Sequence, residues 1–489
     1  MSGSGTTKHE ADVIVVGNGI AGLSAAVTAR QAGARVIALE RSGPEDRGGN
    51  TRWTEAFLRM KSEDAVSDDF VSHFAKHAGH HLDPEIVAET AGDFESRSSI
   101  AKAFGFTDPD VIARFADEAP DAVRWLKSFG VRFDFLPIYF VTQSTTRLGT
   151  VGGGLAMVEA LGAYADAHGV ETLYRTTARR LIEDASGAIV GVEAVGPGNQ
   201  RIELRAPSVV LACGGFEGNP EMLARYMGAS SRYQRPVARG GYYNRGEGIE
   251  MALAVGAAPA GDYTRFHAEP LDPRSGAPEP VVMVFNYGIM VDVHGNRFTD
   301  EAPWSADATY EAVTRVIGEQ PDGMAWLILD QRIEQVPTWQ RAVRSDQPPV
   351  EAATLHDLAD KIGVPGNALA ETVRAFNAAC PEGLPFAPEA PDGCATLPGF
   401  APRKSNWAFP LEAPFRAYPI ICGNCFTFGG LKVDPRARVL NRDGEAIPGL
   451  YAAGETIGLY WGTYTGATSV LRGAVFGRIA GAEAVARKA

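Results

Sequence analysis

The stretch Asp12–Gly22, which reads DVIVVGNGIAG, decides the fold of this chain, together with RVIALE at Arg35–Glu40. A short apolar run leads into a glycine turn and then into small residues with helical character. A second apolar run follows and ends in an acid. This order of strand, turn, helix and strand is typical of units that bind dinucleotides. The sequence therefore predicts an α/β fold that begins with a dinucleotide-binding unit.

The individual residues of this unit have separate physical roles. Gly17 allows the tight turn, Gly19 lets the backbone approach a pyrophosphate, and Gly22 lets the helix pack against the sheet. The helix start offers free N–H groups and a partial positive charge to phosphates. Glu40 can accept hydrogen bonds from both ribose hydroxyls, and its charge disfavours a 2′-phosphate.

Composition limits the remaining possibilities. The chain has 489 residues, 45% of them hydrophobic and 21% charged, which suits about two or three domains with large cores. A formal charge of -13 and the absence of Lys/Arg runs argue against nucleic-acid binding. No stretch approaches the roughly 18 apolar residues of a membrane span. Five cysteines in so long a chain point to a reducing compartment, and Met1–Ala11 carries no secretory signal. We therefore expect a cytoplasmic protein.

The texture of the sequence divides the chain into three parts. Residues 1–261 begin with the dinucleotide unit and include a mostly helical stretch, 62–135, with caps such as Asp83-Pro84 and Asp108-Pro109. Residues 262–424 contain more Pro and Trp and long polar loops, which suggests an inserted domain. Residues 425–489 return to the character of the first part.

Five short motifs occur in a distinctive order. They are GGNT at Gly48–Thr51, ACGGF at Ala212–Phe216, GNRFTDE at Gly295–Glu301, GGLKVD at Gly429–Asp434 and GLYAAGE at Gly449–Glu455. Together they resemble the succinate dehydrogenase/fumarate reductase flavoprotein family over nearly the whole chain. The resemblance implies a Rossmann-like FAD-binding domain of the glutathione-reductase type, split in sequence, with an inserted α+β capping domain over the flavin.

Three further motifs refine this resemblance. RGGNTR at Arg47–Arg52, HAEP at His267–Pro270 and GATSVLR at Gly466–Arg472 look most like the FAD-dependent tricarballylate dehydrogenases of that family. Urocanate reductases and 3-ketosteroid Δ1-dehydrogenases are more distant. The family places the residues AGE and TSV near the ribityl chain and the pyrimidine end of the flavin. The full set of expected cofactor residues is Gly17, Gly19, Ala21, Gly22, Glu40, Arg41, Gly48, Gly49, Asn50, Thr51, Ala178, Ala212, Cys213, Gly214, Gly454, Glu455, Thr468, Ser469 and Val470.

The flavin is expected to be bound without a covalent link and without a second nucleotide. Some family members attach the flavin to a histidine just after the Gly-Gly loop, but here no histidine occurs between that loop and His73. A second dinucleotide fingerprint for NAD(P)H is missing. Electrons are therefore expected to enter from the substrate or from a separate protein. The electron acceptor remains open between oxygen, a quinone and a redox protein.

The expected reaction is the removal of two hydrogens across a C–C bond next to an electron-withdrawing group. The sequence departs from fumarate reductases at their catalytic positions. Ser305 stands where their proton-donating arginine is expected, Cys425-Phe426 replaces a histidine pair, and Tyr464 replaces a substrate-binding arginine. Fumarate reduction by that mechanism is therefore not expected.

Four residues are the catalytic candidates. His267 lies where the family binds a substrate carboxylate, and Tyr464 aligns with a position that holds a ketone oxygen in ketosteroid dehydrogenases. Arg239 could face an anion, and Tyr287 could assist a base. Each also has a structural interpretation, as a core histidine, packed aromatic rings or a solvated loop arginine. The remaining arginine candidates are Arg52, Arg245 and Arg472, the last interpreted as structural.

Two other pairs receive a structural interpretation. Arg297 and Glu301 are expected to form a buried pair that holds the cap. Cys422 and Cys425 have zinc- or redox-like spacing, but four ligands are not available, so packing is favoured and no metal site is expected, although a redox pair stays open.

The sequence thus predicts an FAD-dependent dehydrogenase of a C–C bond α,β to a carboxylate, with a small polycarboxylate of the tricarballylate type as lead substrate. The alternatives are an α,β-desaturase of a cyclic ketone and a flavin-bearing electron carrier.

Overall fold

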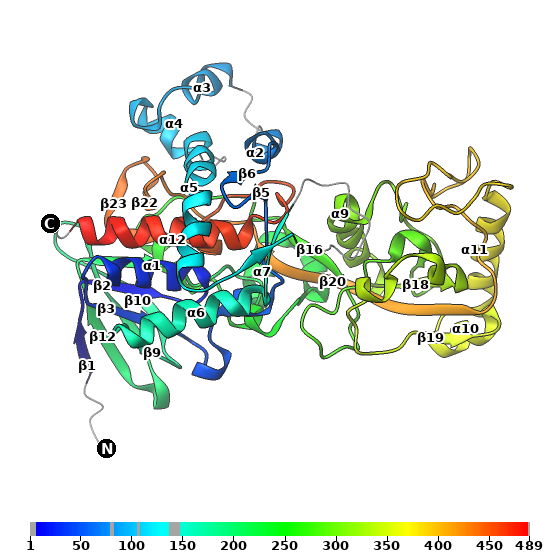
Figure 1. The fold of residues 1–489 in the computed structure, drawn as a ribbon, viewed down its shortest axis with the longest axis horizontal. Coiled ribbons are helices and arrows are strands. Elements are labelled where there is room, and N and C mark those ends of the chain that lie inside the picture. The colour runs from blue at the N-terminus through cyan, green and yellow to red at the C-terminus, as the bar shows by residue number, and fades with distance from the viewer. Residues whose placement is uncertain (1–5, 79–82, 105–107, 136–146, 488–489) are drawn as a thin grey trace.

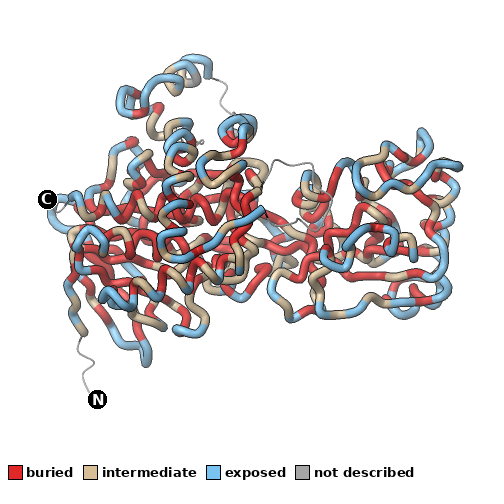
Figure 2. The backbone as a smooth tube through the Cα atoms, in the orientation of Figure 1, coloured by how far each residue is buried: buried red, intermediate tan, exposed pale blue. Residues whose placement is uncertain are grey.

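Two bodies lie side by side along the long axis of the molecule in the computed structural model (Figure 1). The structure describes residues 6–78, 83–104, 108–135 and 147–487. Each body has its own buried interior, as the red segments of Figure 2 show. Both described ends of the chain belong to the first body.

A six-stranded sheet forms the centre of the first body. Its order is β22-β23-β13-β2-β3-β9, and all neighbours are parallel except β22 and β23. The strands β2, β3 and β13 are buried at every position, as expected for a parallel sheet covered on both faces. The strand bounds are β2 Val13–Val16, β3 Val36–Leu39, β9 Glu171–Leu173, β13 Ser208–Leu211, β22 Arg438–Leu440 and β23 Ala446–Ala452. Segments from both ends of the chain therefore share one sheet.

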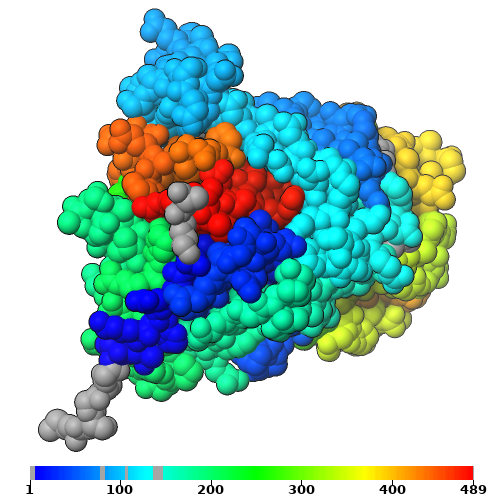
Figure 3. Space-filling view, turned by 60° about the vertical axis from the view of Figure 1, so that its left-hand side comes forward, coloured from blue at the N-terminus to red at the C-terminus, as the bar shows by residue number. Residues whose placement is uncertain are grey.

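Glycines bring two helices close together beside this sheet. Helix α1, Ile20–Gln31, packs against α12, Ser469–Ala486, and Figure 3 shows the two side by side in blue and red. A Cβ atom on Gly477 would lie 2.4 Å from the Ala21 carbonyl oxygen. A Cβ atom on Gly22 would lie 1.9 Å from the Gly17 carbonyl oxygen, so the close contact of α1 with the turn before it leaves no room for a side chain at this position.

The helical stretch predicted after the second strand is present in four pieces, α2 Phe70–Ala78, α3 Pro84–Glu89, α4 Ser99–Ala103 and α5 Pro109–Ser128. The predicted caps are confirmed, because the Asp83 and Asp108 carboxylates accept hydrogen bonds from the first N–H groups of α3 and α5. The other elements of the first body are β1 Thr7–Glu10, β4 Phe57–Leu58, β5 Met60–Ser62, β6 Ala65–Val66, β7 Phe133–Asp134, β8 Leu148–Thr150, α6 Gly153–Ala167, β10 Thr177–Glu183, β11 Ile189–Val195, β12 Arg201–Arg205, α7 Pro220–Met227, α8 Glu247–Ala254, β15 Pro259–Ala260 and β21 Gly430–Leu431.

The second body is built on a long strand, β20, Phe415–Thr427. Five strands pair with it directly or through β18: β14 Arg235–Pro236, β16 Phe266–Leu271, β17 Ile289–Val291, β18 Met324–Asp330 and β19 Val350–Ala352. Helices α9 Ala306–Gly318, α10 Leu355–Ile362 and α11 Gly366–Ala379 complete it. Most strands of its sheet fall within the predicted capping segment, 262–424. Strand β14 precedes that segment, and the last residues of β20 follow it.

The mixed α/β class expected from the sequence is confirmed by these two bodies. Within the described ranges, no helix combines the length and the apolar character that crossing a membrane requires. The buried pair expected in the second body is also present. Arg297 donates to Glu301 at 2.9 and 2.6 Å, with both side chains almost completely buried.

Candidate active site

A large pocket lies at the carboxyl ends of the central strands, where Gly17 follows β2, Glu40 follows β3 and Ala212 follows β13. Open α/β sheets bind ligands at this edge. The same pocket is lined by residues of the second body, including His267 and Glu269 on β16. It therefore joins a groove in the first body to a set of side chains from the second.

Backbone atoms form much of the groove. Gly17 has φ +107°, and a Cβ atom there would lie 2.2 Å from the Ala212 carbonyl oxygen. The Glu40 carboxylate accepts hydrogen bonds from the N–H groups of Asn18 at 3.1 Å and Ser42 at 2.8 Å, and burial raises its pKa. A wall of glycines, a helix start and an oriented acid fit a dinucleotide.

All but three of the predicted cofactor residues line this pocket, and the exceptions lie just behind it. Gly22 is the contact between α1 and the first turn. Gly48 has φ +115° and packs against Val158. The Thr468 hydroxyl contacts the Thr465 carbonyl and the Tyr460 hydroxyl. The remaining residues, Gly17 to Val470 in the set given above, are brought together from seven separate segments of the chain.

Tyr464 lies at the start of α12. Its hydroxyl oxygen accepts hydrogen bonds from the backbone N–H groups of Thr468 at 2.9 Å and Ser469 at 3.0 Å. The hydroxyl itself donates to the Ser469 Oγ at 3.1 Å. These are N–H groups of the helix start that we expected to face the flavin, so the positive end of α12 is directed at the Tyr464 oxygen in this structure.

His267 sits in the pocket among aromatic rings and acids. Its Nε2 lies 3.4 Å from the Tyr310 hydroxyl and 3.6 Å from a Glu269 oxygen. The ring centre is 4.4 Å from that of Tyr464. The buried Nδ1 has no hydrogen-bond partner among the described residues and lies 4.0 Å from Glu311 Oε2. The structure thus brings together His267 and Tyr464, two of the four predicted catalytic residues, at the wall of the pocket.

Three carboxylates line the pocket near this histidine: Glu55, Glu269 and Glu279. Glu279 accepts a hydrogen bond from Arg344 at 2.8 Å, and Arg344 also lies 3.4 Å from Glu55. Burial raises the pKa of Glu279 to about 8, and the nearby Glu269 acts in the same direction although Arg344 opposes it. Glu279 also has φ +45°, a left-handed conformation that is uncommon for residues other than glycine.

Two of the four predicted catalytic residues are not brought to the pocket. Arg239 has a side chain that is 65% exposed and pairs with Asp46 at 2.7 Å. The Tyr287 hydroxyl donates to the Pro388 carbonyl at 2.8 Å, and its ring packs against Trp407, so it is part of the second body's core. Their structural interpretations fit the structure better than the catalytic ones.

The other arginine candidates differ in their position relative to the pocket. Arg52 pairs with Glu159 at 3.2 Å, and Arg245 does not line the pocket. Arg472 is buried below the pocket, with its guanidinium 4.7 Å from the centre of the Tyr460 ring. Its expected structural role agrees with this contact, although part of it reaches the pocket wall.

The cysteines with CxxC spacing have different surroundings. Cys422 is buried among Phe266 and Ala268, whereas Cys425 lines the pocket. Both are free thiols. Residues three apart on a strand point to opposite faces, so this spacing does not bring the two sulfur atoms together.

Sequence reasoning missed Glu269, Glu279, Tyr310, Arg344 and Arg147 as pocket residues. Glu269 had a usable signal, because it follows His267 by two residues on a strand and so shares its face. The others come from a loop, a helix and segments distant in sequence, and no local pattern marks them.

The glycine-lined groove fits a dinucleotide, and side chains of the second body line the other end of the pocket. Comparison with known proteins identifies the chain as an FAD-dependent oxidoreductase that acts on C–C bonds. The chain belongs to the FAD binding domain family, whose profile matches residues 12–471. The resemblance to fumarate reductase flavoproteins is confirmed at the level of the fold by a flavocytochrome c3 fumarate reductase, with a TM-score of 0.75, 24% identity, and coverage of 98% of this chain and 78% of that one.

Two curated relatives match nearly the whole chain. The NADH:acrylate oxidoreductase of Vibrio harveyi is 28% identical, over 98% of this chain but only 51% of its own length, so the chain spans about half of that protein. The 4-oxocyclohexanecarboxylate 2-dehydrogenase of Sinomonas cyclohexanicum is 29% identical, over 96% of this chain and 91% of that protein.

Proposed function

We propose that this chain is an FAD-dependent α,β-desaturase of a small ring ketone. The observation that carries the proposal is the composition of one end of the pocket, the part lined by His267, Glu269, Glu279, Tyr310 and Tyr464. We call this part the reaction end. His267, Tyr310 and Tyr464 supply imidazole and hydroxyl hydrogen-bonding groups there, next to the carboxylates Glu55, Glu269 and Glu279. This surface suits a neutral carbonyl better than a multiply charged anion. The relative from Sinomonas, named for the dehydrogenation of a ring ketone, supports the same choice.

A polycarboxylate of the tricarballylate type is the second candidate, supported by the resemblance of the HAEP and GATSVLR motifs. Arginines normally bind such anions through paired hydrogen bonds. Here Arg239 lies outside the pocket, and Arg344 is already paired with Glu279 and close to Glu55. Arg147 lines the pocket 3.8 Å from Asp307. The cationic groups that three substrate carboxylates need are therefore largely committed to protein acids.

FAD, held by the groove residues given above, would supply the acceptor for the hydride that leaves the β-carbon. The chain's own residues handle the carbonyl oxygen and the α-proton. A hydrogen-bond donor at His267 or Tyr310 holds the carbonyl oxygen and stabilises the negative charge that develops on it. The Tyr464 hydroxyl can join them only by releasing its hydrogen bond to Ser469 Oγ. The Glu279 carboxylate takes the α-proton, and the electrons of that C–H bond form the new C=C bond as the hydride departs. A carboxylate with a pKa near neutrality suits this task.

The experiment is an anaerobic titration of the purified flavoprotein with candidate substrates, followed through the visible flavin absorption. We expect cyclohexanone-type ketones, 4-oxocyclohexanecarboxylate among them, to bleach the flavin and to yield the enone. Bleaching by tricarballylate alone would transfer the proposal to the second candidate. If neither class bleaches a flavin that an added redox protein can still reduce, the chain is an electron carrier and the proposal is wrong.

The mode of flavin attachment has its own test. We propose non-covalent FAD, because Trp53, Thr54 and Glu55 follow the Gly-Gly loop where a linking histidine would stand. Acid precipitation should release the yellow colour completely into the supernatant. Colour that stays with the pellet would contradict this.

A further inference from the structure

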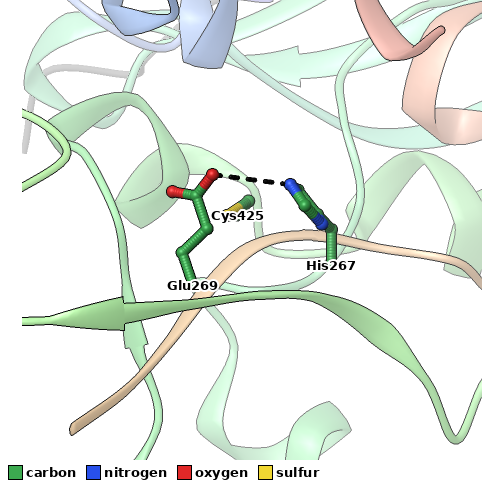
Figure 4. A group of neighbouring side chains, drawn as sticks. All are labelled: His267, Glu269 and Cys425. Carbon is green, nitrogen blue, oxygen red and sulfur yellow. Dashed lines mark ion pairs between the residues drawn. The ribbon is translucent and has the colours of Figure 1, made fainter. Parts of the chain in front are cut away.

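We propose that His267, Glu269 and Cys425 form a Zn²⁺-binding site in the wall of the pocket, and that a bound Zn²⁺ excludes the substrate. The three side chains come from two adjacent strands, His267 and Glu269 from β16 and Cys425 from β20 (Figure 4). No local sequence pattern joins them. Zinc binding stands apart from the choice of substrate, whereas the competition with substrate rests on the proposed function.

A β-bulge creates the cluster. In the pairing of β16 with β20, His267 lies opposite Phe426 and Ala268 lies opposite Asn424, so Cys425 is the extra residue between two paired positions. A bulge of this kind re-aims the side chain of the extra residue. Here it turns the Cys425 thiol into the pocket, next to two side chains that share one face of β16.

The donor set matches what zinc binds in proteins. Imidazole nitrogen, thiolate sulfur and carboxylate oxygen are its usual ligands, in tetrahedral geometry with bonds of about 2.0 to 2.3 Å, which puts neighbouring ligand atoms roughly 3.3 to 3.8 Å apart. One candidate ligand atom from each side chain lies within 4.8 Å of the other two, and His267 Nε2 lies 3.6 Å from a Glu269 oxygen. Small side-chain rotations therefore close the site around an ion.

The second ring nitrogen of His267, Nδ1, is also placed as metal binding through Nε2 would require. When Nε2 binds a metal, Nδ1 carries the proton, and metal-bound histidines usually direct that N–H at a carboxylate. His267 Nδ1 is buried, lacks a hydrogen-bond partner in the part of the chain that the structure describes, and lies 4.0 Å from Glu311 Oε2. Glu311 is itself fixed by Arg315 and by the Tyr464 backbone N–H, which donates to it at 3.2 Å. This arrangement sets the orientation of the ring.

Three protein ligands leave one tetrahedral position open, and here that position faces the pocket. Water or a small anion can fill it. Because His267 also belongs to the surface that receives the carbonyl group, the ion and the substrate compete for the same space. Zn²⁺ should therefore act as a reversible inhibitor that is competitive with substrate.

The test is direct binding of Zn²⁺ to the flavin-loaded protein without substrate, measured by competition with a chromophoric chelator. We expect one tight equivalent per chain, removed by excess chelator. Cys425→Ser and Glu269→Gln should each weaken binding by at least about tenfold. Cys422→Ser is the matched control, a cysteine three residues away on the same strand but outside the pocket, and should bind like wild type.

The zinc X-ray absorption edge gives a second measurement. The extended fine structure above that edge should show one sulfur neighbour at about 2.3 Å and lighter atoms at about 2.0 to 2.1 Å. Absence of a tight equivalent, equal weakening by Cys422→Ser and Cys425→Ser, or a zinc shell without sulfur would each overturn the proposal. Since binding is measured without turnover, failure here leaves the ketone assay untouched, and failure of that assay leaves the zinc site untouched.

Discussion

The groove of the first body and the reaction end beside β16 are built from different kinds of atoms. The groove uses backbone atoms and glycines, so its shape is set by steric exclusion. A Cβ atom at Gly17, Gly214 or Gly454 would lie within 3 Å of another atom. The reaction end uses long charged and aromatic side chains, and its character is set by burial and by the pairing of charges.

The difference teaches where each region tolerates change. A groove made of backbone fails when volume is added, because backbone cannot retreat. A charged cluster tolerates changes in volume more readily, but it responds to the removal of a single charge, since the partner left behind is buried. Substitutions can therefore separate the two regions by the kind of change that harms them.

The largest effect is expected from Gly17→Val in the groove. The side chain would overlap the Ala212 carbonyl oxygen at a position with φ +107°, so the protein should lose nearly all of its flavin. The ratio of visible to ultraviolet absorbance of the purified protein measures this. Gly33→Ala is the matched control, with φ +87° but nothing within 4 Å, and should cost about 1 kcal/mol of stability while keeping the flavin. Equal flavin loss in both variants would contradict the steric argument.

The next effect is expected from Glu279→Gln at the reaction end. The base must be ionised, so kcat/KM for desaturation should rise with pH, about tenfold per unit, until it levels off near the raised pKa of about 8. Glu279→Gln should lower kcat/KM by about 10² to 10⁴-fold and abolish that rise, with flavin content unchanged.

Glu55→Gln serves as the control for that variant. Glu55 also lies near Arg344, at 3.4 Å, so its loss disturbs the same arginine without removing the proposed base. The rise with pH should persist in Glu55→Gln. If the rise persists in Glu279→Gln as well, another group takes the proton.

A smaller effect, on stability alone, is expected in the second body. Glu301→Ala leaves Arg297 buried without its partner, along with Lys404, whose Nζ lies 3.8 Å from Glu301. Loss of one member of a buried pair costs about 3 to 5 kcal/mol. Chemical denaturation measures this loss. Glu371→Ala, which breaks an exposed pair with Arg374, should cost no more than about 1 kcal/mol. Similar losses in the two variants would show that burial of the pair does not matter.

The smallest effect is expected from Arg239→Ala. Its exposed pair with Asp46 lies outside the pocket, so kcat/KM should change by less than about threefold. A loss of a hundredfold or more, measured with a polycarboxylate substrate, would show that Arg239 reaches the substrate and would favour the second candidate function.

Sequence predicted the groove well because its determinants are local. Gly17, Gly19, Glu40 and the helix after the turn lie within thirty residues, and their spacing follows from one strand–turn–helix unit. The cofactor residues from distant segments, such as Ala178 and Ser469, came from the resemblance rather than from spacing. Both kinds of prediction place residues at the pocket wall.

The reaction end could not be predicted from local patterns, because its residues are far apart in the sequence. His267 and Tyr464 were found through alignment with the family, whereas Glu279 meets Arg344 across 65 residues of sequence. The exposure of Arg239 and the burial of Tyr287 depend on packing that no local pattern encodes. The bulge at Cys425 depends on the register of β16 against β20, which the spacing of two cysteines could not reveal.

Strand β20 has a mechanical consequence. It runs unbroken from Phe415, in the heart of the second body, to Thr427, whose backbone N–H donates to Glu455 of the first body at 2.8 Å. Because one continuous strand belongs to both bodies, a change in their relative orientation would strain β20 near the irregular pairing at Cys425. A movement that opens the pocket would therefore displace Cys425 and Phe426, which line it.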